Sequence, residues 1–276
     1  AAEPSGGPPG LGVLALVLGV ALFAVGSRQP TTGIHHEKLS ADIEAPWRIF
    51  SGRKRLISVA LGLLIWLVLL LRLVNGSESA WDLVLWLSAA LLLTIPFVSR
   101  LRVPRRLSRE LRTDILVLGA LVAIFLALNI RDLDDWYYSA IGDEYAFYLS
   151  ARGILDDGLA RPFSQSGVYG FHPVLNSAYQ AATMALFGQD NLGWRLASVL
   201  SVAVTIPGIY LIGRLLGNRR VAAMAALLFA FSHYMFAYAH TGYNNIHAVA
   251  PTVWALGLFV LGLRTRTLLL LYVSGL

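Results

Sequence analysis

Residues 56–74 read LISVALGLLIWLVLLLRLV, a run of 19 residues with a single charged side chain, Arg72. The hydrocarbon core of a bilayer, about 30 Å thick, needs roughly 20 residues of helix to cross it. No water satisfies the peptide backbone there, so continuous apolar runs are expected to be helical. This run therefore predicts a transmembrane helix, and no alternating pattern in the sequence is long enough to indicate a barrel.

Similar apolar runs recur along the chain. They cover 11–26, 81–98, 115–130, 196–216, 221–239 and 246–263, and an eighth begins near Thr267. The runs 11–26 and 115–130 are short, so we expect tilted, thinned or interfacial segments there. Charged residues make up 14% of the chain, against about 25% in soluble proteins, and the mean hydropathy is +0.64. We predict an all-α, polytopic transmembrane helical bundle, and an ordinary soluble enzyme is excluded.

Basic residues mark one side of this predicted bundle. They gather in the connections 27–55, 99–113, 213–220 and 264–266, which alternation of the spans places together. The long segment 131–194 falls on the opposite side and holds eight of the 16 acidic residues. Because Lys-rich and Arg-rich connections stay cytoplasmic, we expect 131–194 to be extracytoplasmic. We expect a multi-pass protein of the plasma membrane whose active site lies on the extracytoplasmic side.

Several classes of function are disfavoured by the residues present. The net charge is +6, but its basic clusters flank membrane spans, where they anchor the chain to lipid headgroups rather than to nucleic acid. The chain has no cysteine, no His-Glu-x-x-His motif, no Walker loop and no dinucleotide fingerprint. We expect no metal and no other cofactor, and no nucleic acid partner.

Polar chemistry concentrates in the long outer segment. Its residues 142–158 predict a short amphipathic helix along the outer surface, with an apolar stripe of Ala146, Leu149, Gly153 and Ile154. Asp143 and Glu144 fall in the first turn, where carboxylates also serve simply as helix caps. Adjacent residues point about 100° apart on a helix, so one acid can face a cavity while the other holds a basic partner such as Arg152 or Arg161.

The order of several motifs resembles the polytopic GT-C glycosyltransferases of the family 39 and aminoarabinose-transferase-like group, which includes protein O-mannosyltransferases. The resemblance covers roughly 115–276. It rests on Gly142-Asp143-Glu144-Tyr145, Phe171-His172-Pro173-Val174-Leu175, Leu186-Phe187-Gly188, Trp194-Arg195-Leu196-Ala197-Ser198 and the hairpin at 217–220. We therefore divide the chain into an N-terminal extension, 1–114, with three predicted spans and basic linkers, and the N-terminal part of a GT-C-like domain, 115–276. Because the chain begins at Ala1 and ends within an apolar run, we expect it to be a fragment.

The resemblance implies a membrane enzyme that moves a sugar from a polyprenyl-phosphate carrier to a hydroxyl acceptor at the extracytoplasmic face, with inversion. The acceptor is a lipid, a glycan or a protein. The family's key carboxylate maps onto Asp143, with Glu144 beside it, and a positioned carboxylate suits a general base. Candidates for binding the substrate and its phosphate are Tyr145, Arg152, Arg161, Tyr169, His172, His240, Asn244 and Asn245.

Two departures from the family pattern stand out. Val174 replaces the second proline of the family's His-Pro-Pro-Leu stretch. Many relatives carry Arg and Asp in the short outer loop after the span 221–239, whereas residues 240–245 here read HTGYNN. The role of a second carboxylate is therefore unfilled.

Two other classes of function remain open at this stage. A secondary transporter would use Asp143, Glu144, His233 and His240 as an ion relay, since His233 and His240 lie seven residues apart and share a helix face. The acids lie in an outer loop, however, and no inverted repeat is visible. A noncatalytic membrane subunit would use the outer segment only to bind another protein.

Overall fold

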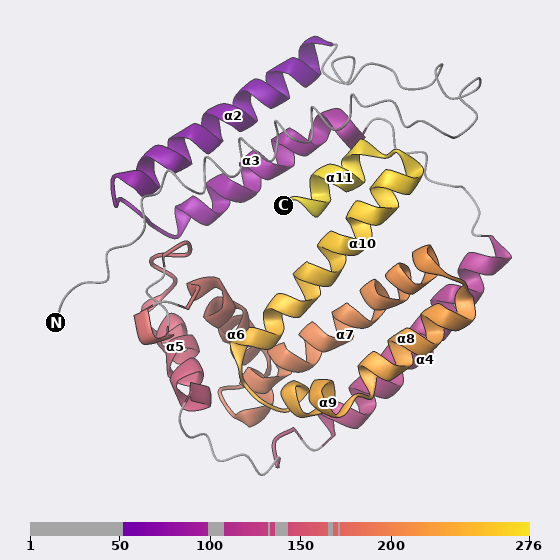
Figure 1. The fold of residues 1–276 in the computed structure, drawn as a ribbon. Helices are drawn as coiled ribbons and strands as arrows, with labels where there is room; N and C mark the ends of the chain where they lie inside the picture. The colour runs from indigo at the N-terminus through magenta and orange to yellow at the C-terminus, as the bar shows by residue number, and fades with distance from the viewer. Residues whose placement is uncertain (1–51, 99–107, 132, 136–142, 165–167, 171) are drawn as a thin grey trace, which may run out of the picture. The chain divides into compact units, whose positions relative to one another are not determined.

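The computed structural model describes residues 52–98, 108–131, 133–135, 143–164, 168–170 and 172–276. All regular structure among them is helical (Figure 1). The predicted span 11–26 lies outside the described residues, as does most of the basic linker that follows it. The all-α prediction is confirmed for the part of the chain that the structure describes.

The first two described helices form a hairpin. Helix α2, Arg53–Val74, and helix α3, Trp81–Val98, pack along each other. Arg72 Nε lies 2.6 Å from Asp82 Oδ1, and Asp82, which is fully buried, also accepts a hydrogen bond from the backbone N–H of Ser79. A charged residue in an apolar helix is costly unless paired, so this ion pair closes the hairpin at the end where its turn lies.

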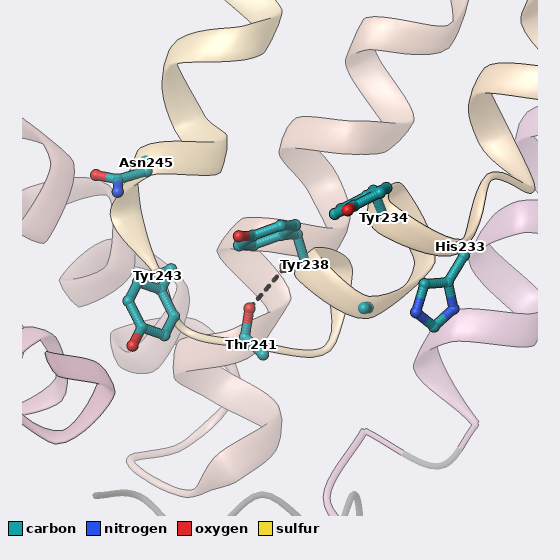
Figure 2. Close-up of a pocket in the computed structure, with 7 residues that line it drawn as sticks. His233, Tyr234, Tyr238, Thr241, Tyr243 and Asn245 are labelled. Atoms are coloured by element: carbon teal, nitrogen blue, oxygen red, sulfur yellow. Dashed lines mark hydrogen bonds between the residues drawn. The ribbon is translucent and has the colours of Figure 1, made fainter. Parts of the chain in front are cut away.

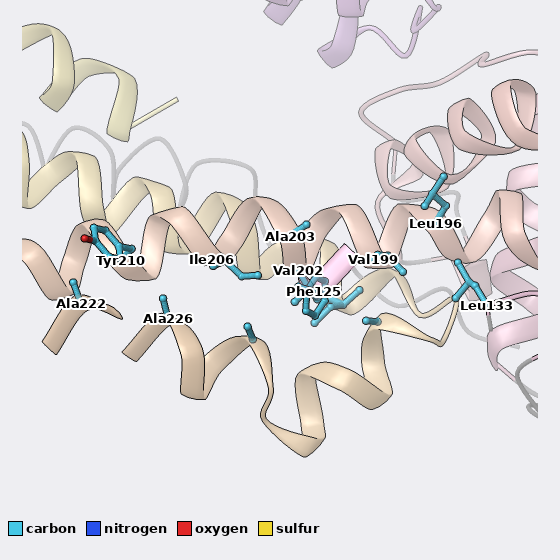
Figure 3. Packing of buried hydrophobic residues seen from close by; sticks show 13 residues of the cluster. Phe125, Leu133, Leu196, Val199, Val202, Ala203, Ile206, Tyr210, Ala222 and Ala226 are labelled. Atoms are coloured by element: carbon cyan, nitrogen blue, oxygen red, sulfur yellow. The ribbon is translucent and has the colours of Figure 1, made fainter. Parts of the chain in front are cut away.

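Helix α7, Asn191–Leu216, is the centre of the remaining bundle. It contacts α4, Arg109–Ile130; α8, Arg219–Ala230; and α10, Val249–Thr265. Phe125 of α4 and Val199, Val202 and Ile206 of α7 form the middle of the core (Figure 3).

Helix α8 packs against α7 through small side chains. Ala222, Ala226 and Ala230 are spaced four residues apart, so they share a face, and all three are fully buried. A Cβ built on Gly213 of α7 would lie 2.6 Å from the Cα of Ala222, which shows how closely the two backbones approach. Small residues at regular spacing are the usual means of close helix packing in membranes.

The chain between α4 and α7 forms shorter elements. Helix α5, Asp143–Asp157, is followed by the 3₁₀ turn η3, Val168–Gly170, and by helix α6, Val174–Phe187. The short amphipathic helix predicted for 142–158 is thus confirmed. Its predicted stripe is wrong, because Glu144, Phe147 and Ala151 are the buried residues and Leu149 is exposed.

Within the described part of the chain, five helices are long and apolar enough to cross a membrane, by length and composition. They are α2, α3, α4, α7 and the continuous stretch Asn244–Thr265, which joins the 3₁₀ turn η4, Asn244–Ala248, to α10. The fourth predicted span, 115–130, was too short. Helix α4 begins at Arg109, because Ser108 caps it by accepting a hydrogen bond from Leu111 N. Its 22 residues suffice for a full crossing.

The predicted span 221–239 is not one straight helix. Helix α8 ends at Ala230, and α9, His233–Ala239, continues at an angle of 52°. Ser232 causes the break, because its extended backbone stops α8 and its Oγ accepts a hydrogen bond from Met235 N to cap α9. The bent pair makes a sixth crossing if it counts as one span. The predicted eighth segment is helix α11, Leu268–Ser274.

Two arginines of the predicted basic connection 213–220 gather around the first turns of α4. Asp114 of α4 lies 2.6 Å from Arg219 Nε and 3.4 Å from Arg214 Nε, and it accepts a hydrogen bond from Tyr210 Oη at 2.7 Å. We call these four residues the basic-end cluster. In the outer segment, α6 packs against α7, and α5 packs against α6.

Candidate functional site

The first turn of α5 separates its two acids into different environments. Asp143 is exposed, whereas Glu144 is 1% exposed. Neighbouring residues on a helix point in different directions, and here one carboxylate faces the surface and the other faces the bundle. The sequence analysis expected this division of directions, and the structure confirms it.

Glu144 joins three elements of the fold. Its Oε1 lies 3.2 Å from Arg195 Nε of α7 and accepts a hydrogen bond of 2.8 Å from the backbone N–H of Gly242, in the connection between α9 and η4. Arg195 is fully buried as well. The partner of Glu144 is therefore Arg195, and the expectation of Arg152 or Arg161 is wrong.

Gly242 is held from both sides. Its N–H donates to Glu144, and its carbonyl accepts a hydrogen bond of 2.6 Å from Gln180 Nε2 of α6. A Cβ at this position would overlap the ring of Trp194, which is itself buried, so only glycine fits. The connection between α9 and η4 is thus fixed against α5, α6 and α7.

Several buried polar atoms around this junction make no hydrogen bond within the described part of the chain. They are Glu144 Oε2, Gln180 Oε1, both amide atoms of Asn244 and both ring nitrogens of His247. Ser177 and Ser198, on the neighbouring turns of α6 and α7, also have buried hydroxyls without such a partner. Most buried polar groups in proteins are paired, so this end of the bundle holds unused hydrogen-bonding capacity.

Asp143 belongs to a second, more exposed group. Tyr169 of η3 donates a hydrogen bond of 2.6 Å from its Oη to Asp143 Oδ1. Among the described residues, no Lys or Arg lies within ion-pair distance of Asp143. The hydrogen bond to Asp143 is the main cause that raises the pKa of Tyr169 above its ordinary value, followed by burial and by the charges of Asp143 and Tyr243.

The backbone at Tyr169 is unusual. Its φ of 58° lies in the left-handed region, and Gly170 follows with a φ of 75°. Such a conformation costs of order 1–3 kcal/mol in a non-glycine residue and is common at functional sites. It directs the Tyr169 side chain to Asp143 and near His172, whose ring centroid lies 6.4 Å from that of Tyr169 and 5.1 Å from that of Phe147.

An open pocket of about 400 Å³ lies beside this group (Figure 2). Helix α9 and the connection after it line the pocket with His233, Tyr234, Ala237, Tyr238, Thr241, Tyr243 and Asn245. Tyr243 links the pocket to α5, because its ring lies 5.6 Å from that of Phe147, one turn after Asp143. The helix that carries the exposed carboxylate therefore contacts a residue of the pocket.

The predicted substrate-binding residues are divided by the structure. Tyr169, His172 and Asn245 lie at the Asp143 group or in the pocket, whereas Asn244 is buried beneath it. His240 is buried, with Nδ1 2.8 Å from the carbonyl oxygen of Phe236, and so does not share the exposed position of His233.

The two predicted arginines and Tyr145 lie apart from the pocket lining. Arg152 is exposed and lies 3.8 Å from Asp156, and it is nine residues, or about 13 Å of helix, beyond Asp143. Tyr145 stacks on Tyr148 with ring centroids 6.1 Å apart. Arg161 is exposed in the connection after α5.

Reasoning from the sequence missed several residues of the site. Arg195 directly precedes the apolar run 196–216, and a charge at the edge of a predicted span is a signal of a paired or functional position. Tyr234 and Tyr238 are also part of the pocket but were not predicted to bind substrate. Gln180 and Gly242 carry no local signal, because their importance comes only from the contact between distant elements.

Comparison with known proteins agrees with the sequence resemblance. Residues 171–276 match a family model described as dolichyl-phosphate-mannose-protein mannosyltransferase. The matched part contains His172, Arg195 and the whole pocket, whereas Asp143 and Glu144 precede it. No curated protein and no solved structure matches the chain. With the spans described above, this match supports a multi-pass membrane glycosyltransferase of the mannosyltransferase type.

Proposed function

We propose that this protein transfers a sugar from a polyprenyl-phosphate carrier to a hydroxyl acceptor at the extracytoplasmic face, with Asp143 as the general base. The observation that carries the proposal is the position of Asp143. Its carboxylate is exposed and lacks a basic partner among the described residues, and Phe147, one turn further along α5, contacts Tyr243 of the open pocket. The match of 171–276 to a dolichyl-phosphate-mannose-dependent family supports the donor class.

The reaction is a single inverting displacement. The acceptor oxygen forms a bond to the anomeric carbon, the bond from that carbon to the phosphate oxygen breaks, and the polyprenyl phosphate leaves with the electron pair. The acceptor's proton goes to Asp143. Because Tyr169 donates to Oδ1, Oδ2 remains for this proton. A base in this role contributes typically 10²–10⁴-fold to the rate.

The departing phosphate needs donors or positive charge as its own negative charge grows. His172, whose ring lies near that of Tyr169, and the exposed Arg161 are the proposed groups. Arg195 is unsuited to this role because it is fully buried against Glu144.

Glu144 has a positioning role in this proposal. A buried carboxylate that accepts from both Arg195 and Gly242 is engaged in holding the connection that lines the pocket. Asp143 and Glu144, predicted together as catalytic residues, are thereby given different tasks.

Membranes containing the protein, supplied with radiolabelled dolichyl phosphate mannose, test the proposal. Label should leave the donor for an acceptor, and Asp143→Asn should lower that transfer by 10²-fold or more. Asp156→Asn is the matched control, since Asp156 is an exposed acid of the same helix. Normal transfer by Asp143→Asn would refute Asp143 as the base, and ion-driven uptake without transfer would favour a transporter.

A further inference from the structure

The pocket beside Asp143 has a distinctive lining. Helix α9 contributes His233, Tyr234, Ala237 and Tyr238, which are spaced so that they share one face. Figure 2 shows the rings of Tyr234 and Tyr238 on neighbouring turns, with Tyr243 and Asn245 on the adjoining connection. The bend at Ser232 turns α9 away from the direction of α8 and so presents this face.

The side chains that line the pocket combine flat apolar rings with hydrogen-bonding groups. Three tyrosines, Thr241 and Asn245 supply hydroxyl and amide groups, and none of the described lining residues is Lys, Arg, Asp or Glu. Aromatic rings offer broad apolar faces at low cost in conformational entropy. Such a surface suits an uncharged ring that carries several hydroxyls.

The pocket is also correctly placed with respect to the reacting groups. Tyr243 lines it, and its ring lies 5.6 Å from that of Phe147, one turn after Asp143 on α5. A sugar ring bound beside Tyr243 would therefore lie next to the helix that carries Asp143.

We propose that the pocket formed by α9 and the connection to η4 binds the sugar ring of the lipid-linked donor. This inference rests on the proposed function. Tyr234 and Tyr238 contact the ring face, and Thr241 and Asn245 bind ring hydroxyls. We place the carrier phosphate outside the pocket, because Lys and Arg, the usual phosphate partners, are absent from the described lining and His233 is its one group able to carry positive charge. The prenyl chain, which has no polar group, would offer the Asn245 amide no hydrogen-bonding partner.

Equilibrium binding of two lipids to the purified protein in nanodiscs tests the inference. Dolichyl phosphate mannose carries the sugar, and dolichyl phosphate lacks it. The wild-type protein should bind the mannosylated lipid more tightly. Tyr238→Ala should weaken that binding about tenfold, the value of one good ring contact, and leave the binding of dolichyl phosphate within twofold.

Three further variants make the test specific. Tyr238→Phe keeps the ring face and should retain most of the affinity, and Asn245→Ala should weaken only the mannosylated lipid. Phe187→Ala, which removes an exposed aromatic residue of α6 outside the pocket, is the matched control and should bind both lipids normally.

The outcomes distinguish an error in the proposed sugar site from an error in the proposed reaction. If Tyr238→Ala and Asn245→Ala weaken both lipids equally, or neither lipid, the sugar does not occupy the pocket and the inference is refuted. If the wild-type protein binds neither lipid, the proposed donor is wrong. Asp143→Asn should bind the mannosylated lipid like the wild-type protein while transferring no mannose, so lost catalysis is not mistaken for lost binding.

Discussion

Two tyrosine–aspartate pairs occur among the described residues, one at the basic end of the bundle and one in the outer segment. At the basic end, Tyr210 donates to Asp114 at 2.7 Å, and Arg214 and Arg219 neutralise that carboxylate. At the outer end, Tyr169 donates to Asp143 at 2.6 Å, and no described basic residue pairs with it. A short hydrogen bond from a tyrosine is thus made to a carboxylate that arginines neutralise at the basic end, and to a carboxylate with no described basic partner at the outer end.

The surroundings of the two pairs differ in the same way. The acid of the basic-end cluster has all its partners within the protein, so it joins α4, α7 and α8 into one unit. The outer end has an open pocket and, in Asn244, His247 and Gln180, buried polar atoms that no described residue pairs with. Satisfied polar groups indicate a structural role, and unsatisfied ones indicate a place where something else binds.

The largest effect on stability is expected from Glu144→Gln. It leaves the Arg195 charge buried without its carboxylate, a change that costs about 3–5 kcal/mol in buried pairs. Thermal unfolding in detergent should show a large fall in Tm. Asp114→Asn, the control from the basic-end cluster, should cost less than half as much, because its arginines are partly exposed to solvent. Equal falls in Tm would show that the Glu144–Arg195 pair contributes no more to stability than the basic-end cluster does.

Two closely packed glycines provide the next comparison. Gly242→Ala would push on the buried Trp194 ring, and Gly213→Ala would push on the backbone of Ala222. Overpacking of this kind costs typically 1–3 kcal/mol, so both variants should melt at a lower temperature. Only Gly242→Ala should also reduce sugar transfer per folded molecule, because it displaces the connection that lines the pocket. Reduced transfer by both would indicate a general loss of packing.

The smallest effect is expected in the pH dependence of the hydrogen bond between Tyr169 and Asp143. Because the pKa of Tyr169 is raised, its hydrogen bond to Asp143 is complete below the ordinary tyrosine value of about 10 and is lost only as the pH rises through the higher, folded-state value. Ultraviolet titration of the wild-type protein minus Tyr169→Phe should show one tyrosine ionising above 10. A difference curve centred at or below 10 would contradict this. Tyr169→Phe should reduce transfer a few-fold, and Tyr210→Phe should leave transfer unchanged.

Hydropathy predicted the bounds of a helix well where its apolar run is uninterrupted. The ends of α3 match the predicted run, and α2 differs only by three residues at its start. The start of α4 was missed because its first turns are charged, although Ser108 is a recognisable capping residue. The break before α9 was missed for a related reason: an average over apolar residues does not detect one serine that caps a new helix.

The site could be predicted only in part. The placement of Asp143 and Glu144 in a first turn follows from local sequence, and so does their divergence. The pairing of Glu144 with Arg195 does not, because 51 residues separate them and only the packing of α5 on the bundle brings them together. Arg152 has the right charge to pair with an acid of the first turn, but it lies too far along α5 to reach one.

The bend between α8 and α9 affects which surroundings this span can have. A broken helix exposes backbone groups that acyl chains cannot satisfy, so such a break persists where water or protein surrounds it. Where water fills the open pocket, the proposed glycosyl donor would face water as a rival nucleophile, at a concentration that no acceptor matches. Fidelity would then depend on how the acceptor hydroxyl is aligned, and slow hydrolysis of the donor is the expected side reaction when no acceptor is bound.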